Sequence, residues 1–260
     1  MPSKTHLIYF SPTKTTKKIV EGIAAGLGSG EIEHYDLTRM EHGLDLRLSD
    51  GVAVIGVPVY AGRVPEVCLE RMKNLSAAGV PALLVALYGN REFEDALVEL
   101  RDLAICKGFS VIAAGAFIGE HSYSTGAQPI AVNRPDESDL RKAREFGAAI
   151  AKRMEKNSRL ETPAMPGNVP YRERLPLGGI APETDRDRCN LCGACVEVCP
   201  TFVIAATDEV TTEAENCILC CACVKDCPEG ARALNHPVVE GRREMLIKNC
   251  SKRREPELFF

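Results

Sequence analysis

The chain has 260 residues, of which 45% are hydrophobic and 26% charged, and its formal net charge is −4. These values are typical of a folded globular protein; they exclude a disordered chain and give nucleic-acid binding little support. No stretch approaches the roughly 18 uninterrupted apolar residues of a membrane helix, and the start lacks the order of a signal peptide. We therefore expect a cytoplasmic protein, and the length favours two domains.

Apolar, strand-like runs alternate with helical patterns over the first 158 residues. Strands are predicted at 4–10, 31–37, 52–59, 81–88 and 111–118, and helices at 14–27, 65–73, 92–107 and 138–156. Such alternation is typical of a parallel sheet covered by helices on both faces. We expect residues 1–158 to form an α/β domain with a five-stranded parallel sheet.

A loop rich in hydroxyl groups follows the first predicted strand and leads into a helix. Its residues are Ser11, Pro12, Thr13, Lys14, Thr15 and Thr16. Helix N-terminal N–H groups and hydroxyls can hold a phosphate monoester, with a lysine as a nearby charge. The glycines of a Walker loop and of a dinucleotide-binding turn are missing. The loop predicts a phosphate site, with a hydroxyl-rich helix cap as the alternative.

The loops after the third, fourth and fifth predicted strands carry glycines and aromatic residues. They run over 58–63, 88–91 and 119–124. In an open α/β sheet such loops meet at the edge where ligands bind. Glycine permits close approach of the backbone to a ligand, and an aromatic ring can stack on a planar one. Together with the phosphate loop, these features indicate FMN.

Prolines and glycines interrupt the chain from 159 to 182, beginning at Pro163. A continuous helix or a central strand cannot pass through such a stretch, because proline lacks the N–H donor that both require. We expect an extended linker between two domains, long enough to place the second domain against the edge of the flavin.

Nine of the twelve cysteines lie between Cys189 and Cys227. The run C-x2-C-x2-C-x3-C-P begins at Cys189 and again at Cys217, which is the signature of bacterial two-cluster ferredoxins. In that pattern three cysteines of each run bind one 4Fe-4S cluster and the fourth binds the other. The predicted ligands are Cys189, Cys192, Cys195 and Cys227 for one cluster, and Cys217, Cys220, Cys223 and Cys199 for the other. Structural zinc is the alternative, and we interpret Cys221 as a thiol that is not a ligand.

Residues 183–236 are too few to build a large core, so we expect cluster ligation to supply much of their folding energy. From Asp185 to Arg232 there are nine acidic and four basic side chains, a sum of −5. The tail, 237–260, contains six basic and four acidic side chains, a sum of +2. A solvated helix is the expectation for this basic tail, and contact with an acidic neighbour or a partner is the alternative.

In its loops and cysteine runs the chain resembles flavodoxins, and more closely the flavodoxin-ferredoxin fusion proteins of anaerobic bacteria and archaea, over most of its length. The resemblance implies an α/β flavodoxin-like fold with strand order 2-1-3-4-5, followed by an α+β two-cluster ferredoxin domain. It also implies that the FMN phosphate binds at Ser11, Thr13, Lys14, Thr15 and Thr16. The isoalloxazine would lie against two loops, formed by Pro58, Val59, Tyr60, Ala61, Gly62 and Arg63 and by Tyr88, Gly89, Asn90 and Arg91.

Two features depart from the flavodoxin pattern. The chain has no tryptophan, whereas many short-chain flavodoxins stack one on the flavin; Tyr60 is the candidate substitute, with strand-end packing as the alternative. Many flavodoxins surround FMN with acidic residues, but here Arg63 and Arg91 lie in the flavin loops. We hypothesise that they stabilise reduced flavin and raise its potential. His121 could donate to the flavin or accept a proton, although an exposed or capping role is favoured.

Clusters carry one electron at a time and flavin one or two, so a chain that holds both joins one-electron to two-electron chemistry. We expect an iron-sulfur flavoprotein that passes electrons between two 4Fe-4S clusters and FMN and on to another redox protein. One alternative is an FMN-dependent reductase of a small molecule, which needs an open pocket over the flavin. Another is a ferredoxin on a flavodoxin-like scaffold that binds no flavin.

Overall fold

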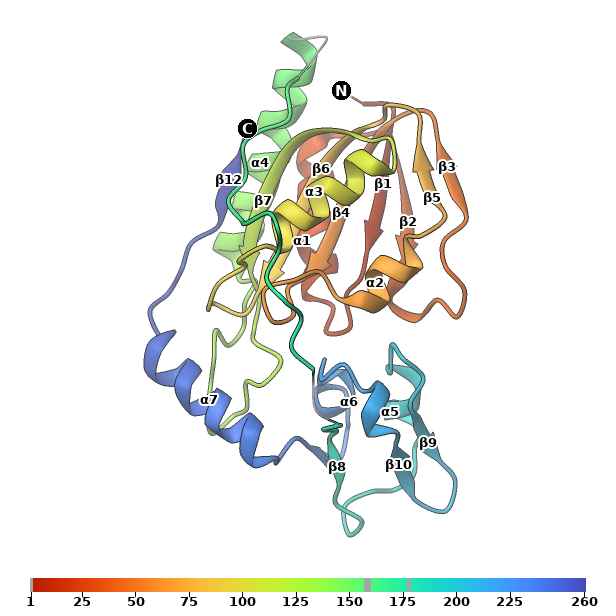
Figure 1. Cartoon of the computed structure of the whole chain (residues 1–260), viewed down its shortest axis with the longest axis vertical. Helices are drawn as coiled ribbons and strands as arrows, with labels where there is room; N and C mark the ends of the chain where they lie inside the picture. The colour runs from red at the N-terminus through yellow and green to blue at the C-terminus, as the bar shows by residue number, and fades with distance from the viewer. Residues whose placement is uncertain (1, 157–159, 177–178) are drawn as a thin grey trace.

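The computed structural model describes residues 2–156, 160–176 and 179–260. Its larger part is an α/β unit built on a six-stranded sheet, and a smaller part with short strands and helices lies below it in Figure 1. The helix α7 (Pro237–Asn249) and the segment after it return from the smaller part to the larger one. The chain therefore crosses between the two parts twice.

The sheet contains five mutually parallel strands, and its full order is β12-β7-β6-β4-β1-β2. These five are β1 (Lys4–Tyr9), β2 (Glu31–Asp36), β4 (Val52–Pro58), β6 (Pro81–Tyr88) and β7 (Ser110–Ile118). Nearly all residues of β4, β6 and β7 are buried, because helices cover both faces, and this explains their unbroken apolar runs. The order is that of the flavodoxin-like fold, in which ligands bind where the order reverses, here between β1 and β4.

The five predicted parallel strands are present in the order 2-1-3-4-5, and the end of the chain adds an antiparallel sixth that was not predicted. Residues Glu257–Phe259 form β12, which pairs antiparallel with β7 and places Leu258 opposite Gly115. The helix expected in the tail is present as α7, but it is not simply solvated, since it buries Val239 and Leu246. A strand of three residues gives no alternating pattern that a sequence could reveal.

Two helices cover each face of the sheet. The helices α1 (Thr15–Leu27) and α4 (Glu137–Lys156) share one apolar core, and α2 (Glu66–Arg71) and α3 (Ala96–Cys106) share the other. The backbones of α1 and α4 approach closely: a Cβ on Gly26 would lie 2.0 Å from the carbonyl oxygen of Arg144. Glycine is therefore required at this helix contact. A short pair of strands, β3 (Leu46–Leu48) and β5 (Leu75–Ala77), and the 3-10 turn η1 (Leu37–Arg39) lie outside the main sheet.

The smaller part contains two short helices, each of which starts inside a cysteine run. These are α5 (Ala194–Glu197) and α6 (Ala222–Lys225), and each follows a residue in the left-handed conformation, Gly193 in the first run and Cys221 in the second. Around them lie the pairs β8 (Glu183–Thr184) with β11 (Arg232–Ala233) and β9 (Ile204–Ala206) with β10 (Val210–Thr212), and the turn η2 (Ala214–Asn216). The sequence repeat is thus a structural repeat.

Residues 160–176 form neither helix nor strand, and they follow the outside of the α/β part down to the smaller part (Figure 1). The side chain of Asp95, at the start of α3, accepts hydrogen bonds from the backbone N–H groups of Asn168 and Arg172, at 2.8 and 2.7 Å. The hydroxyl of Tyr171 donates to Asp102 at 2.6 Å. These contacts fix the path of the segment on α3.

Polar contacts also join the smaller part directly to the sheet loops. Lys14 pairs with Asp226 at 2.7 Å, and Lys225 pairs with Glu120 at 2.8 Å. The buried guanidinium of Arg71 donates to the carbonyl oxygen of Pro200, immediately after the first cysteine run. Two adjacent residues at the end of α6, one basic and one acidic, therefore each form an ion pair with the α/β part.

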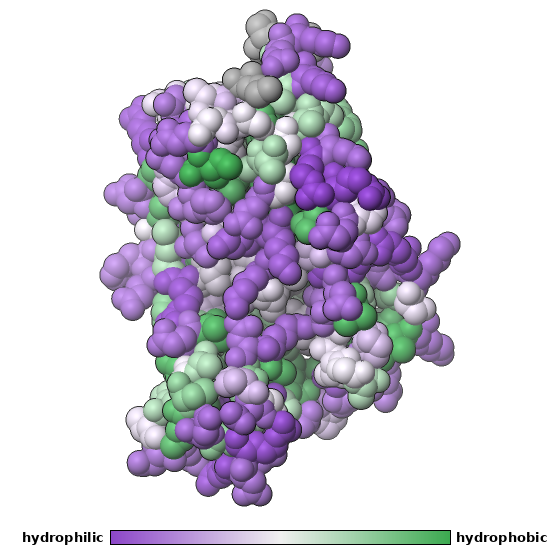
Figure 2. Space-filling model, turned by 180° about the vertical axis from the view of Figure 1, so that it is seen from behind, coloured by the Kyte–Doolittle hydropathy of each residue, from purple (hydrophilic) through white to green (hydrophobic). Residues whose placement is uncertain are grey.

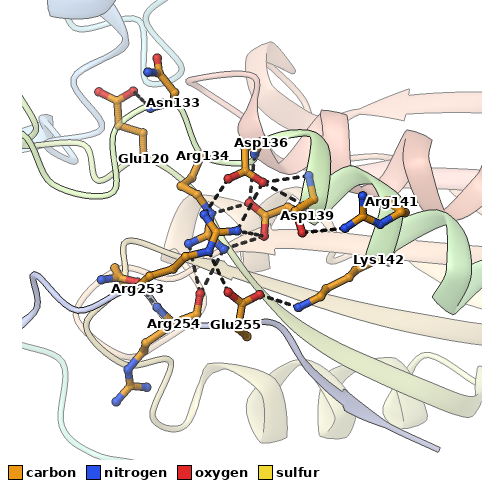
Figure 3. Close-up of polar contacts among 12 residues, drawn as sticks. Glu120, Asn133, Arg134, Asp136, Asp139, Arg141, Lys142, Arg253, Arg254 and Glu255 are labelled. Carbon is orange, nitrogen blue, oxygen red and sulfur yellow. Dashed lines mark hydrogen bonds and ion pairs between the residues drawn. The ribbon is translucent and has the colours of Figure 1, made fainter.

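Residues 250–259, which we call the clasp, are held on the α/β part by an ion-pair network (Figure 3). Arg134 and Asp139 form a buried pair, and the guanidinium of Arg134 also donates to the carbonyl oxygen of Arg254 at 3.1 Å. Arg253 pairs with Asp136 at 2.6 Å, which with nearby backbone donors holds the pKa of that carboxyl well below its usual range. The network ties the start of α4 to the strand that completes the sheet.

Among the described residues, no helix combines the length and the apolarity that crossing a membrane requires. The face seen in Figure 2 is mostly hydrophilic, with apolar residues in separate patches.

Candidate functional site

A cavity of about 320 Å³ lies at the carboxyl edge of the sheet, where the two parts of the chain meet. Its walls include the loops after β1, β4, β6 and β7, and also the linker, the second cysteine run and α7. Twelve of the fifteen residues predicted to bind FMN line it. They are Ser11, Thr13, Thr15, Thr16, Pro58, Val59, Tyr60, Ala61, Gly62, Tyr88, Gly89 and Arg91.

The hydroxyl-rich loop at one end of the cavity opens α1. The hydroxyl of Ser11 accepts a hydrogen bond from the backbone N–H of Lys17 at 3.0 Å, which fixes the first turn of the helix. The hydroxyls of Thr13 and Thr15 lie 3.2 Å apart. That of Thr16 is buried and has no hydrogen-bond partner within the described residues. A buried hydroxyl without a partner is costly, so the loop is suited to a polar ligand such as a phosphate.

The loop after β4 is a tight turn that presents its backbone to the cavity. Tyr60 and Arg63 exchange backbone hydrogen bonds of 3.0 and 3.1 Å, and Ala61 and Gly62 between them adopt positive φ angles. A Cβ on Gly62 would lie 1.7 Å from the carboxylate of Glu94. The glycine therefore allows the two loops to meet, as required for a narrow slot beside the sheet.

The loop after β6 packs equally closely against the loop after β7. A Cβ on Gly89 would lie 2.3 Å from the ring of His121. His121 lines the cavity, and its Nδ1 accepts a hydrogen bond from the backbone N–H of Tyr123 at 3.0 Å. Burial, together with the cations of Lys225 and Arg91, lowers the pKa of His121 to about 4. The ring is thus neutral near pH 7 and carries its hydrogen on Nε2.

Two aromatic residues of the cavity wall lie close to the second cysteine run. Burial raises the pKa of Tyr60 well above its usual value, and the neighbouring thiols Cys220 and Cys221 raise it further when ionised. Tyr123 packs on the same apolar cluster as Leu219 and Cys217. Tyr60 therefore lies between the sheet edge and the cysteine region, where the sequence predicts a ring that stacks on flavin.

Three predicted FMN residues do not line the cavity. Lys14 is directed to Asp226, and Arg63 forms a two-point ion pair with Glu99, at 2.8 and 2.7 Å. The amide of Asn90 donates to the backbone carbonyls of Cys250 and Lys252, at 2.6 and 2.9 Å, and its oxygen accepts from Arg254 N. Each of the three side chains contacts a residue that is distant in sequence.

The cationic side chains of the cavity wall come from three separate segments. Arg91 follows β6, Arg172 belongs to the linker, and Arg242 belongs to α7. Arg91 and Arg172 share one carboxylate, that of Glu94. Arg242 lies beside the hydroxyl of Tyr123 and has no ion pair with any carboxylate of the described residues. Glu92 and Glu120 line the wall as well, but they pair with Arg254 and Lys225, so Arg242 is the lining cation without a carboxylate partner among the described residues.

Sequence reasoning missed every wall residue that lies after the sheet domain. These are Arg172, Leu175, Pro176, Ile218, Leu219, Arg242, Met245 and Leu246. The edge rule for α/β sheets directs attention to loops that follow strands, and none of these residues belongs to one. The one available signal was the composition of the basic tail, which the sequence alone does not attach to any site.

The eight predicted cluster ligands divide between two small cavities in the smaller part. Cys189, Cys192, Cys195 and Cys227 line the first, which we call the first cluster cavity. Cys217, Cys220, Cys223 and Cys199 line the second cluster cavity. The fourth cysteine of each run thus lies with the first three of the other, the arrangement that crossed ligation requires.

Hydrogen-bond donors point at some of these sulfurs. The backbone N–H of Ala231 donates to Cys227 Sγ at 3.2 Å, and the guanidinium of Arg232 donates to Cys223 Sγ at 3.7 Å. Such bonds stabilise thiolate ligands and tune cluster potentials. Among the residues that the structure describes, no three His, Cys, Asp or Glu side chains converge on the position of a single metal ion. A cubane takes one thiolate on each of its four irons, and four predicted ligands line each cluster cavity.

Cys221 takes the position that Gly193 has in the first run. Its φ angle is 58°, and its thiol donates to the carbonyl oxygen of Leu219 at 3.6 Å. It also lines the second cluster cavity. Its side chain is therefore committed to the turn that begins α6.

Residues 182–205 match the model of the 4Fe-4S binding domain, which indicates a 4Fe-4S cluster at the first cysteine run. No match was found among curated proteins.

Solved structures that match the chain include a flavodoxin from the domain Archaea, with 13% identity and a TM-score of 0.41 over 58% of this chain and 99% of that one. Oxidised flavodoxin 2 from Bacillus cereus matches with 17% identity and a TM-score of 0.42 over 58% and 99%. Rubredoxin oxygen:oxidoreductase from Desulfovibrio gigas matches with 12% identity and a TM-score of 0.40 over 59% and 36%. The strand order of the sheet, and not these matches, identifies the flavodoxin-like fold.

Proposed function

We propose that the chain is an iron-sulfur flavoprotein that passes electrons between two 4Fe-4S clusters and FMN, and exchanges them with another redox protein of the cytoplasm. The observation that carries this proposal is the composition of the main cavity. The sheet loops that suit a flavin and the second cysteine run form walls of the same cavity. A flavin in that cavity would be adjacent to a cluster within one chain.

The residues present fit FMN at both ends of the cavity. The unpartnered hydroxyl of Thr16 and the first turn of α1 suit the phosphate, and the glycine-bearing loops after β4 and β6 suit a flat ring. The volume of about 320 Å³ lies near the lower limit for ligand sites, which suits one cofactor and leaves little space for a second molecule. When bound, FMN supplies the conversion between one-electron and two-electron transfer.

The cysteine groups fit two 4Fe-4S clusters rather than one. Each cluster cavity is lined by four of the predicted ligands, and each group of four draws on both runs. In this arrangement the loss of one cluster would leave cysteines of both runs without iron. When bound, the clusters supply one-electron steps.

The structure changes which cations are candidates to stabilise reduced flavin. Arg63 is held by Glu99 outside the cavity, and Arg91 shares Glu94 with Arg172. Arg242 is the cavity cation that has no carboxylate partner within the described residues. We therefore assign to Arg242, with Arg91, the role that the sequence suggested for Arg63 and Arg91.

The size of the cavity favours an electron carrier over a reductase of small molecules. The reductase alternative needs an open pocket over the flavin, whereas a volume of about 320 Å³ leaves little space for a substrate beside FMN. A scaffold that binds no flavin is disfavoured by the buried hydroxyl of Thr16, whose desolvation would then have no compensation.

Anaerobic purification with measurement of iron, sulfide and flavin tests the proposal. We expect about eight irons, about eight sulfides and one FMN per chain, and stepwise reduction that bleaches both cluster and flavin absorption. The phosphate site is tested by comparing FMN with riboflavin on flavin-depleted protein. Riboflavin should bind more weakly, and Thr16→Val should weaken FMN binding while leaving riboflavin binding nearly unchanged.

Thr5→Val is the matched control, because Thr5 is also buried but lies in β1, away from the cavity. It should leave the preference for FMN unchanged. Zinc in place of iron, or protein that binds neither flavin, would contradict the proposal.

A further inference from the structure

The two cluster cavities differ in their relation to the FMN cavity. Ile218, between the ligands Cys217 and Cys220, lines both the FMN cavity and the second cluster cavity. Leu219, which follows it, is 4% exposed and also lines the FMN cavity. Ile218 therefore forms part of the wall of both cavities, and the second cluster cavity adjoins the FMN cavity there.

A second contact brings the same cysteine run to the flavin loops. Tyr123, of the loop after β7, lines the FMN cavity and packs on the apolar cluster that contains Leu219 and Cys221, with Cys217 at its margin. The thiols of Cys220 and Cys223 are buried. The second cluster cavity thus adjoins the FMN cavity, and most of the cysteines that line it are buried.

The first cluster cavity has the opposite surroundings. Within the described residues, none of its lining residues also lines the FMN cavity. Cys192 is exposed, and its neighbour Leu191 is 42% exposed with a φ angle of 57°. The loop from Asn190 to Gly193 therefore presents one edge of this cavity to solvent.

Contact between the two cluster cavities is direct. Cys195 of the first and Cys199 and Cys223 of the second belong to one buried apolar cluster, together with Val203 and Ile204. An electron that enters at the first cavity can therefore reach the second through packed side chains, without passing through solvent.

We propose that the two clusters have different duties. The cluster bound by Cys217, Cys220, Cys223 and Cys199 is the inner one, which exchanges electrons with FMN across Ile218. The cluster bound by Cys189, Cys192, Cys195 and Cys227 is the outer one, which meets the external redox protein at Leu191 and Cys192. This assignment rests on the proposed function and deepens it.

The electron balance fits this order of sites. An external one-electron donor, itself an iron-sulfur or flavin protein, is oxidised by one electron in each of two encounters at the outer site. Both electrons cross the inner site, and with one proton from solvent they reduce FMN by two electrons. In the opposite direction the same sites release two electrons singly to an external acceptor, and the proton returns to solvent.

Nuclear magnetic resonance of the cysteine β-protons tests the assignment on the full chain with its clusters. Iron shifts these signals away from the rest of the spectrum, so the two ligand sets can be assigned and compared with and without FMN. We expect FMN to move the signals of Cys217 and Cys220 and to leave those of Cys189 and Cys192 in place. Movement of the first set alone, of both sets equally, or of neither would overturn the proposal.

Rate measurements on two apolar variants provide a second test. Ile218→Ala should slow equilibration between clusters and flavin several-fold and leave reduction of the clusters by a photoreduced 4Fe-4S ferredoxin unchanged. Leu191→Ala should slow reduction of the clusters by the ferredoxin several-fold and leave equilibration between clusters and flavin unchanged. Val238→Ala, at an exposed apolar position of α7 that lines none of the three cavities, should change neither rate. The opposite pattern for Ile218 and Leu191, or no effect of either variant, would overturn the proposal.

The failure of this inference is distinguishable from the failure of the proposed function. Protein that lacks FMN or iron would contradict the proposed function itself. Protein with both cofactors, in which FMN perturbs the first ligand set, would contradict only the order of the two clusters.

Discussion

The α/β part and the cysteine-rich part bury very different amounts of apolar surface. In the first, two large cores pack on the faces of the sheet, with side chains such as Leu7, Phe10 and Phe146 fully buried. In the second, residues 179–236 contribute two small clusters, and cysteines are members of both. The first part has the means to fold by apolar burial, whereas the second needs its ligands to be bound.

Iron removal should produce the largest difference between the two parts. When a chelator strips the clusters under anaerobic conditions, we expect residues 183–236 to lose nearly all protection from hydrogen exchange, because ligation replaces a core there. The central strands β4 and β6 should keep theirs. Hydrogen exchange with mass spectrometry resolves the two regions, and a cysteine region that stayed protected without iron would show that its small clusters suffice.

The next largest effect should come from a polar pair in the α/β part. Arg134→Ala would remove the two-point partner of the fully buried carboxylate of Asp139, which keeps a longer contact of 3.7 Å with Arg253, at a cost of about 3 kcal/mol in the free energy of unfolding. Arg141→Ala is the control, since its pair with Glu145 is exposed and is worth about 0.5 kcal/mol or less. Urea denaturation followed by circular dichroism measures both. Equal effects of the two variants would show that the clasp network contributes little beyond a surface pair.

The smallest of the three effects concerns α7, which follows the cysteine region in sequence but lines the FMN cavity. It tests whether this helix influences the flavin. Arg242→Gln should reduce the preference of the site for reduced over oxidised flavin by about tenfold, which lowers the two-electron midpoint potential by about 30 mV. Lys248→Gln, on an exposed position of α7, should leave the potential unchanged. A spectroelectrochemical titration compares the variants, and an unaltered or higher potential in Arg242→Gln would contradict the role of Arg242.

Most of the parallel sheet could be predicted because its strands are buried on both faces and read as apolar runs between helical patterns. The strand β12 could not, since three residues give no period and their partner β7 lies well over a hundred residues earlier. The pairing of β12 with β7 depends on where α7 places the end of the chain, and the local sequence of β12 does not predict it.

The candidate site shows the same division between local and distant information. The loops that follow β1, β4 and β6 could be located because the carboxyl edge of a parallel sheet collects them. The direction of Lys14, Arg63 and Asn90 could not, because each side chain turns to a partner remote in sequence, namely Asp226, Glu99 and the backbone of the clasp. The residue type shows whether a side chain is charged or polar, but its neighbours in the fold determine its direction.

The antiparallel pairing of β12 with β7 has a consequence for synthesis on the ribosome. Residues 257–259 are translated after the cysteine region, so β7 presents an unpaired edge until that whole region has emerged. An open, apolar strand edge is a template for pairing with other chains. Cluster insertion and completion of the sheet are thus close in time, and a chain stalled before β12 would be prone to aggregate through β7 even when its five parallel strands had formed.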